Sequence, residues 1–476
     1  MSEARWGGQL PTELVPENAP FDEEQRAWLN GFLAGLLGLA GSEPRAAVEA
    51  RASGPENAKP EPEPGARAWA LGGAARRSVR SQVGDLTAPA ALRAAYSAVR
   101  PRLVGQGRER REAQRVRVKS QKKLTLADAG SEIREVVLEL TDPDLTYRAG
   151  DCLAVFPHND PDLVRSLLRA VGARGQELVT TANGSCEVWR CLLEDVDITH
   201  VRDETLQLFV QHAGRGEDVR TLRELLSQGA QQSFDLLDLL AMFPSSRPSI
   251  DQIASTLGVL EPRLYAIASA PSSHPAELHL AVRMVRVERG GRERKGVASH
   301  FLSEGVFRGD EVSVQIHSGD RFVLPEDLSG PMIMLGSGTG VARYRAFLQE
   351  LEARGRRGNT WLIMASYFEG DEALYEAELK AWSRLGVLEH LDVVKLGQRG
   401  RRVGLEDVLR KRARRVVSWL DRGAVVYACG EGKALSAVLD DALIEVLGRQ
   451  GKMSRTEAAE FVHVMRRDGR YVEEVY

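Results

Sequence analysis

The sequence predicts a multidomain protein of the α+β and α/β classes, in which an interrupted antiparallel β-barrel precedes a doubly wound parallel sheet. The barrel is indicated by two regions, 115–140 and 262–287, in which apolar and polar residues alternate as they do in half-buried antiparallel strands. Residues with helical spacing separate these regions, so we expect a helical insertion in the barrel. After Pro325, apolar strands alternate with helices, a pattern typical of a parallel sheet covered by helices.

The composition is that of an ordinary globular protein. The 476 residues are 43% hydrophobic and 28% charged, which suits two or three domains. The formal net charge of −3 gives no reason to expect nucleic acid as a partner. The apolar run Trp28–Ala40 is too short for a membrane span, which needs about 20 apolar residues. Four scattered cysteines without a Cys-x-x-Cys pair predict no metal site and fit a cytoplasmic protein.

Changes in composition divide the chain into predicted segments. An apolar run behind an acidic, cap-forming stretch predicts a helical segment over residues 1–42. Residues 43–110 are rich in Pro, Ala and Glu, which predicts a linker that ends in a basic helix. The remaining segments are the barrel at 111–160 and 258–328, its helical insertion at 161–257, and the doubly wound domain at 329–476.

A glycine turn follows the first strand of the doubly wound domain. The sequence PMIMLGSGTG places Gly336, Gly338 and Gly340 between an apolar strand and a helix. Glycines permit such a turn and let an anion approach the free backbone amides at the start of the helix. Many α/β turns contain glycine without binding a phosphate, so a plain turn is the alternative.

The barrel region contains a second set of candidate ligand contacts. KGVASHFL at 295–302 is a glycine turn that opens a helix, in which Ser299 offers a hydroxyl; a simple capped helix is the alternative. Arg263 supplies a planar cation suited to a pyrophosphate. Alternation places Tyr265 on the same face, where its ring is suited to stack on a flat group. The alternative is an ordinary pair of surface residues on a strand.

Two further features belong to the doubly wound domain. Cys429 in ACGEG ends a strand at the edge where open α/β sheets bind ligands, although a cysteine there is also common core filler. The basic run RGRRVGLEDVLRKRARR at 399–415 has three interpretations: a solvated helix face, a docking surface for an acidic electron carrier, or a phosphate site.

In their order along the chain, these motifs resemble those of the diflavin reductase family, in particular the flavoprotein component of sulfite reductase. The motifs are Tyr-Arg-Ala-Gly-Asp at 147–151, Arg-Leu-Tyr at 263–265, Lys-Gly-Val-Ala-Ser at 295–299, Gly-Ser-Gly-Thr-Gly at 336–340, Ala-Cys-Gly at 428–430 and the terminal Arg-Tyr at 470–471 with Tyr476. The resemblance covers residues 110–476. It implies a ferredoxin-reductase-like architecture of FAD-binding barrel, helical connecting insertion and NADP-binding domain. The first 110 residues lack the strands and glycine turns of the family's FMN domain, so no FMN is expected.

The resemblance also implies roles for individual residues. Arg263 would hold the FAD pyrophosphate, Tyr265 would stack on the isoalloxazine, and Tyr476 would cover its other face. Cys429, Glu474 and Tyr476 are the implied catalytic residues. The other implied cofactor-binding residues are Leu264, Ala266, Ala281, Val282, Arg283, Gly296, Val297, Ala298, Ser299, Gly336, Gly338, Thr339, Gly340, Arg401 and Arg402.

The sequence departs from the family pattern at two places. Ala266 stands where the family has a serine whose hydroxyl bonds near the flavin N5. The loss of one such donor is expected to slow hydride transfer by about 10- to 100-fold. The family's contacts to the 2′-phosphate and adenine of NADPH are replaced by Tyr367, Leu396, Gly397, Gly404, Glu406 and Val438. NADPH and NADH are therefore both retained as expected donors.

The function predicted from these motifs is that of an FAD-dependent oxidoreductase. It would pass a hydride from NADPH or NADH to FAD and send electrons to an external acceptor, such as a flavodoxin-like protein or a hemoprotein. The alternative is an FAD-binding scaffold or partner-binding protein with weakened catalysis and an eroded NADPH site.

Overall fold

The computed structural model describes residues 113–125, 132–181, 184–229, 234–319, 321–366, 373–395, 404–430 and 434–475. The segments predicted at 1–42 and 43–110 lie outside these residues. Among the described helices, none is long and apolar enough to cross a bilayer.

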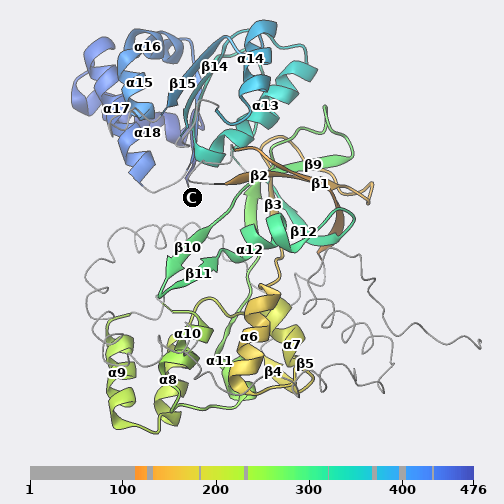
Figure 1. The fold of residues 1–476 in the computed structure, drawn as a ribbon. Coiled ribbons are helices and arrows are strands. Elements are labelled where there is room, and N and C mark those ends of the chain that lie inside the picture. The colour runs from red at the N-terminus through yellow and green to blue at the C-terminus, as the bar shows by residue number, and fades with distance from the viewer. Residues whose placement is uncertain are drawn as a thin grey trace, which may run out of the picture. The chain divides into compact units, whose positions relative to one another are not determined.

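An antiparallel sheet forms the first domain, as predicted. Its six described strands follow the order β8-β3-β12-β1-β2-β9 (Figure 1). The two outer strands meet, because Ile267 bridges Leu280 and the Ala268 amide donates to the His279 carbonyl over 2.8 Å. The sheet therefore closes on itself as a barrel. The strands are β1 (Gln114–Lys123), β2 (Ile133–Glu139), β3 (Cys152–Val155), β8 (Arg263–Ala266), β9 (Glu277–Arg283) and β12 (Glu311–His317).

Alternation along the strands fills the barrel. Val116 and Val118 on β1 are buried while their neighbours are exposed, because successive side chains point to opposite faces of a strand. They pack with Leu138, Leu153 and Leu280 in one apolar core. Burial of such side chains stabilises the domain by roughly 1.5–3 kcal/mol each.

The predicted helical insertion between β3 and β8 also contains short strands. Its helices are α6 (Pro161–Val171), α7 (Val188–Arg190), the π-helical turn η4 (Cys191–Asp195), α8 (Asp203–His212), α9 (Gly216–Ser227), α10 (Leu236–Met242) and α11 (Ile250–Thr256). The strands form two antiparallel pairs, β4 (Leu178–Thr181) with β5 (Gly184–Glu187) and β6 (Val196–Asp197) with β7 (Gly258–Val259). The first pair was missed because its apolar alternation is weak: only Val179 is buried. The Asn-Gly pair at 183–184 in the sequence is the signal that favours such a hairpin.

A hairpin and a short helix follow β9. Strands β10 (Arg286–Arg289) and β11 (Arg292–Lys295) pair in antiparallel fashion. They lead into α12 (Val297–His300) and the π-helical turn η6 (Phe301–Gly305). The predicted glycine turn at Gly296 is therefore the start of a helix.

The last domain is a parallel sheet, as predicted. Its five described strands have the order β15-β14-β13-β16-β17 and are parallel throughout. The strands are β13 (Met332–Ser337), β14 (Thr360–Ser366), β15 (His390–Lys395), β16 (Val425–Gly430) and β17 (Tyr471–Val475). The helices are α13 (Val341–Ala353), preceded by the 3₁₀ turn η7 (Gly338–Gly340), then α14 (Glu376–Leu385), α15 (Leu405–Lys411), α16 (Ala413–Asp421), α17 (Ala434–Gln450) and α18 (Arg455–Arg467). Helix α18 and strand β17 were not predicted.

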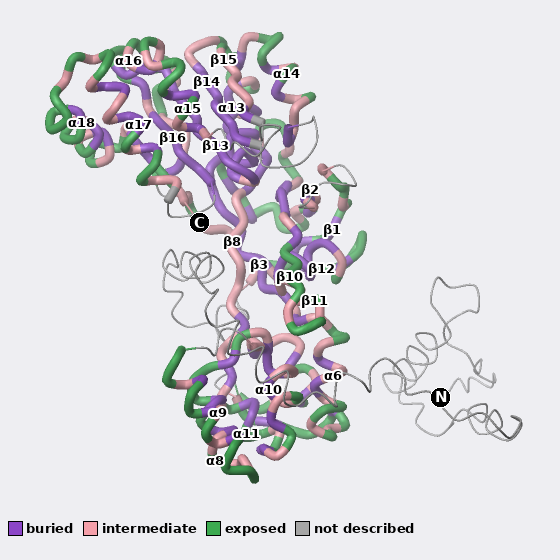
Figure 2. Tube along the Cα trace, turned by 60° about the vertical axis from the view of Figure 1, so that its left-hand side comes forward, coloured by how far each residue is buried: buried purple, intermediate pink, exposed green. Residues whose placement is uncertain are grey.

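Helices cover both faces of this sheet. Met334 and Leu362 on one face pack with Tyr344 and Phe347 of α13. On the opposite face, strand residues pack with α15 to α18 in a second core. Because both faces are covered, β13 and β16 are buried along almost their whole length (Figure 2). This explains why their sequences are continuous apolar runs rather than alternating ones.

Candidate functional site

The glycine turn after β13 is tightly packed. Gly338 has φ +58°, a backbone conformation that glycine adopts without strain. A Cβ on Gly340 would lie 2.5 Å from the carbonyl oxygen of Cys429, and one on Gly336 would lie 3.0 Å from the Tyr344 ring. Thr339 follows Gly338 in the same 3₁₀ turn. The turn therefore depends on its glycines and lies directly against the end of β16.

Cys429 and Glu474 lie side by side at the carboxyl edge of the parallel sheet. They are register partners in the parallel strands β16 and β17. Cys429 is fully buried, and this burial raises the pKa of its thiol to about 12, against the opposing effect of Arg343. The Glu474 side chain retains 33% exposure. The two implied catalytic residues that the structure describes are thus adjacent, one thiol and one carboxylate.

The barrel contributes strand β8 and its partner β3. Arg263, Leu264, Tyr265 and Ala266 form β8, and all four are half-buried. Because these side chains are partly exposed, a ligand can contact them. In the antiparallel pairing with β3, the direct partner of Ala266 is Cys152.

Arg343 connects the two domains at this place. This first-turn residue of α13 is fully buried. Its Nη1 donates to the Gly150 carbonyl over 2.8 Å, and its Nη2 lies 2.7 Å from Cys152 Sγ and also pairs with Glu474. Its guanidinium carbon lies 4.7 Å from the centroid of the Phe322 ring. Arg343 and Cys152 were not predicted as site residues, since neither belongs to a recognised motif.

The turn before Cys152 explains why Gly150 accepts this contact. Gly150 has φ +108°, and a Cβ there would collide with the Phe322 carbonyl oxygen. The Asp151 carboxylate accepts from the amides of Arg148 at 2.8 Å and Gly319 at 3.0 Å. The motif at 147–151 therefore builds a fixed turn that directs the Gly150 carbonyl towards Arg343.

The end of β9 lies beside β8, as the bridge between Ile267 and Leu280 shows. Ala281 is buried at 8% exposure, and Arg283 is half-buried. Val282 is completely buried in the barrel core, because alternation turns its side chain inward. Val282 can therefore offer only its backbone to a ligand.

The second glycine turn has an engaged hydroxyl. Ser299 Oγ donates to the Gly296 carbonyl over 3.0 Å and accepts from the Val285 amide over 3.2 Å. A Cβ on Gly296 would lie 2.8 Å from the Val285 Cβ, so this position requires glycine. Val297 and Ala298 form the first turn of the helix, where backbone amides have no partner within the helix. The amides, rather than the Ser299 hydroxyl, are the donors available to an anion.

The residues present fit a flavin dinucleotide. The donor set comprises the Arg263 and Arg283 guanidinium groups and the first-turn amides of α12, all suited to phosphates. The Tyr265 ring is half-buried on the same strand as Arg263 and is suited to stacking. The chemistry of this set matches the phosphates and flat ring system of FAD.

Several residues singled out in the sequence lie outside the described residues. They are Tyr367, Leu396 and Gly397, which replace the family's contacts to NADPH, the predicted nucleotide contacts Arg401 and Arg402, and Tyr476, which is predicted to cover the flavin. Of the others, Gly404 caps α15 and its amide donates to Asp407 over 3.1 Å. The Glu406 carboxylate folds back over Gly404. Val438 on α17 is 37% exposed.

The described part of the basic run is largely engaged within the domain. Arg410 pairs with Glu445 at 2.8 Å and Arg412 with Asp392 at 2.9 Å, and Arg415 lies over the Trp361 ring. This arrangement fits a solvated helix face, the first of the three interpretations.

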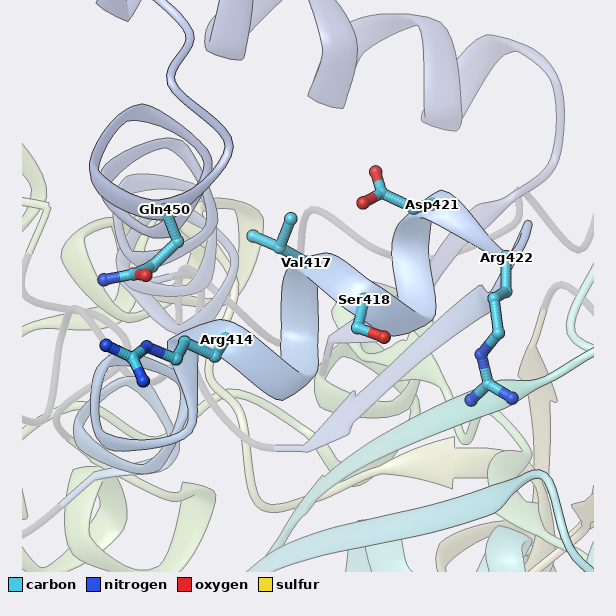
Figure 3. A pocket seen from close by; sticks show the side chains of 6 residues that line it. All are labelled: Arg414, Val417, Ser418, Asp421, Arg422 and Gln450. Carbon is cyan, nitrogen blue, oxygen red and sulfur yellow. The ribbon is translucent and has the colours of Figure 1, made fainter.

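A shallow pocket lies beside helix α16. Its lining comes from α16, from the residue that follows this helix and from the end of α17 (Figure 3): Arg414, Val417, Ser418, Asp421, Arg422 and Gln450. None of these residues belongs to a strand end or a glycine turn, so we do not assign the nucleotide to it.

One His and Glu cluster has the composition of a metal site. His274, Glu277 and His279 bring their ligand atoms within 4.8 Å of one another. However, Arg345 Nη1 lies 3.3 Å from His279 Nδ1, and Lys119 pairs with Glu277. Two cations already occupy the cluster and would repel a metal ion, so we assign no metal to it.

Comparison with known proteins matches both domains to families. Residues 107–301 match the FAD binding domain, and residues 334–439 match the oxidoreductase NAD-binding domain.

Related proteins cover both domains together. A "Sulfite reductase [NADPH] flavoprotein alpha-component" of Mannheimia succiniciproducens is 34% identical over 359 residues, which cover 74% of this chain and 59% of the relative. The protein of the same description from Bacillus subtilis is 35% identical over 364 residues, which cover 74% of this chain and 60% of the relative. That from Vibrio cholerae is 34% identical over 357 residues, with coverages of 74% and 58%. The chain thus spans about three fifths of the length of these relatives.

Proposed function

We propose that the chain belongs to the diflavin reductase family and is an FAD-dependent oxidoreductase that takes a hydride from a nicotinamide nucleotide and delivers electrons to an external acceptor. The matched FAD-binding and NAD-binding domains and the similarity to sulfite reductase flavoproteins support this proposal. FAD, when bound, supplies the redox chemistry by accepting a hydride and releasing electrons singly. The protein supplies the binding surfaces, the orientation and the charges around the reacting atoms.

One juxtaposition carries this proposal. Cys429 and Glu474 are adjacent at the carboxyl edge of the parallel sheet, and Arg343 links Glu474 to Gly150 and Cys152 of the barrel. Ligands of open α/β sheets bind at that edge. The juxtaposition supports a site in which a nucleotide on the parallel sheet faces a flavin on the barrel.

The proposed roles follow the chemistry of each group. Arg263 and the first-turn amides of α12 bind the FAD pyrophosphate, Tyr265 stacks on the ring system, and Tyr476 covers it. Leu264, Ala266, Ala281, Val282 and Arg283 line the cofactor, with Val282 contributing its backbone. The Gly336–Gly340 turn binds the phosphates of the nicotinamide nucleotide, and Arg401 and Arg402 attract them. Cys429 and Glu474 flank the hydride path.

We propose NADPH as donor and keep NADH as the second candidate. The names of the relatives include NADPH, and an NAD-binding domain is matched here. The Glu406 carboxylate at the start of α15 favours NADH, because a carboxylate repels the 2′-phosphate that distinguishes NADPH.

The remaining assignments are proposals of the same kind. The external acceptor is a flavodoxin-like protein or a hemoprotein, the location is cytoplasmic, and no FMN is bound by residues 1–110. The barrel, insertion and doubly wound domain keep the limits predicted from the sequence, at 111–160 with 258–328, at 161–257 and at 329–476.

An acceptor assay tests the proposal. The purified chain is loaded with FAD and mixed with ferricyanide and either NADPH or NADH. We expect ferricyanide reduction that requires FAD and saturates with one of the two nucleotides. FAD-loaded protein that reduces no ferricyanide with either nucleotide would contradict the proposal and favour the scaffold alternative.

A further inference from the structure

A thiol faces Ala266 from the neighbouring strand. Cys152 and Ala266 are direct partners in the antiparallel pair of β3 and β8. The side chains of such partners stand on the same face of the sheet, with Cβ atoms about 5 Å apart. Cys152 is buried at 8% exposure. The Cys152 thiol therefore lies beside the bare methyl of Ala266. In the family pattern the hydrogen-bonding group is instead a serine at position 266 itself.

Two side chains from the other domain fix this thiol. Cys152 Sγ lies 2.7 Å from Arg343 Nη2 and 3.7 Å from Glu474 Oε1. Arg343 also pairs with the same Glu474 oxygen and donates to the Gly150 carbonyl over 2.8 Å. The sulfur consequently has one defined position, in which it accepts from Arg343. Its contact with Glu474 is long, at 3.7 Å, so the thiol proton can turn from Glu474 to a group bound beside Ala266.

Arg343 brings a permanent charge into this buried cluster. A guanidinium is not deprotonated in proteins, and the Arg343 side chain has no exposed surface. Its partner Glu474 retains 33% exposure and adjoins Cys429 across the strand pair. Arg343 is therefore placed to hold the carboxylate and the thiol together and to favour negative charge on a group bound beside them.

We propose that Cys152 supplies the hydrogen-bond donor that Ala266 lacks, and that Arg343 is the positioning residue that fixes Cys152 and Glu474 at the site. This inference rests on the proposed function, since it assigns these side chains to the reacting end of the same FAD site.

The role of Cys152 is tested by removing the hydrogen-bond donor from β3 and placing a new one at position 266 on β8. Anaerobic single-turnover mixing with NADPH or NADH gives the rate of flavin bleaching and the nucleotide concentration at half-saturation. The variants are Cys152→Ala, Cys152→Ser and the double variant Cys152→Ala with Ala266→Ser. Cys186→Ala, in the helical insertion, is the matched thiol-to-methyl control.

The expected results form a clear pattern. Cys152→Ala slows bleaching about 10-fold, the loss of one donor, and leaves the half-saturation concentration unchanged. Cys152→Ser and the double variant recover most of the rate, because each restores a donor on the same face. Cys186→Ala bleaches like the unmodified protein. Bleaching of Cys152→Ala at the unmodified rate, or a double variant as slow as Cys152→Ala, would overturn the role of Cys152.

A second readout does not need a nicotinamide nucleotide. The midpoint potential and visible spectrum of the bound FAD are measured by dithionite titration with an indicator dye. Arg343→Met should lower the potential, because loss of a positive charge disfavours added electrons, whereas Arg343→Lys should hold it near the starting value. Cys152→Ala should shift the visible absorption of the flavin, and Cys152→Ser should restore it.

The two readouts separate the two proposals. If neither nucleotide bleaches the flavin, the proposed donor reaction fails, but the spectrum and potential still test the placement of Cys152 and Arg343. If Arg343→Met retains FAD with an unchanged potential and Cys152→Ala retains an unchanged flavin spectrum, the placement itself is refuted. Cys152→Ser and Ala266→Ser keep the test valid if Arg343→Met does not fold.

Discussion

Arg343 on α13 and Glu474 on β17 form an ion pair in which the arginine side chain has no exposed surface. The same guanidinium reaches Gly150 and Cys152 of the barrel. The buried charge of Arg343 therefore joins three elements: helix α13, strand β17 and the barrel. Since an uncompensated buried charge is costly, these three elements are energetically coupled at the candidate site.

Arg345 on the same helix should be a major determinant of stability. Its side chain, 7% exposed, donates to Glu378 at 2.7 Å and to the Ala268 carbonyl at 2.8 Å. Arg345→Met is expected to lower the free energy of unfolding by about 1–3 kcal/mol, because it removes the donor to the buried Ala268 carbonyl. Urea unfolding measures this loss. The matched control is Arg354→Met, which breaks the exposed pair with Glu350 and should cost less than about 1 kcal/mol. Equal losses in both variants would contradict this assignment.

Gly340→Ala should damage the glycine turn. The new Cβ would lie 2.5 Å from the Cys429 carbonyl oxygen, so the turn or β16 must shift at a cost of about 1–3 kcal/mol. We expect weaker binding of the nicotinamide nucleotide, measured by titration calorimetry, together with lower stability. Gly216→Ala is the control, since a Cβ there has no neighbour within 4 Å. Unchanged nucleotide affinity in Gly340→Ala would argue against this turn as the phosphate site.

Much of the fold could be predicted from local pattern alone. The alternation at 115–140 predicts β1 and β2, and the apolar run before Gly336 predicts β13. In each case the pattern of apolar residues reports how the strand is buried. A strand with one buried face alternates apolar and polar residues, and a strand with two buried faces is a continuous apolar run.

The Arg343 cluster could not be predicted in this way. Arginine is almost never fully buried unless it is paired, so an arginine within VARYRAFLQELEARG indicates a surface position. Its partners Gly150, Cys152 and Glu474 lie 193, 191 and 131 residues away in the sequence. Local spacing carries no information about such distant contacts. The same holds for β17, whose role depends on its pairing with β16.

The two buried thiols of the site should make the protein less stable at alkaline pH. Burial raises the pKa of Cys152 and of Cys429 to about 12, whereas an unfolded thiol titrates near about 8.5. As the pH rises above the unfolded value, the unfolded chain loses these protons first. The free energy of unfolding therefore falls between those two pH values. Urea unfolding from pH 7.5 to 10.5 measures the slope, and Cys152→Ala with Cys429→Ala should make it flatter. An identical slope in that double variant would rule out the thiols as its cause.

Cys429→Ala should slow hydride transfer without removing FAD. Cys429 adjoins Glu474 at the sheet edge, and loss of one well-placed group costs about 1–3 kcal/mol of transition-state stabilisation, or roughly 10- to 100-fold in rate. Stopped-flow bleaching gives the rate, and absorbance of the purified protein gives the FAD content. Cys191→Ala removes another buried thiol, in the insertion, and should leave the rate unchanged. If the two variants bleach equally fast, Cys429 has no role in the reaction.

Anaerobic mixing of the FAD-loaded protein with NADPH and, separately, with NADH tests the central claim most directly. The claim is that this chain transfers a hydride from a nicotinamide nucleotide to its flavin despite Ala266. The predicted result is saturable bleaching of the visible flavin band by at least one nucleotide, slowed when the transferred hydrogen is replaced by deuterium. A yellow protein that stays oxidised with both nucleotides, yet bleaches with dithionite, would contradict the claim and leave an FAD-binding scaffold.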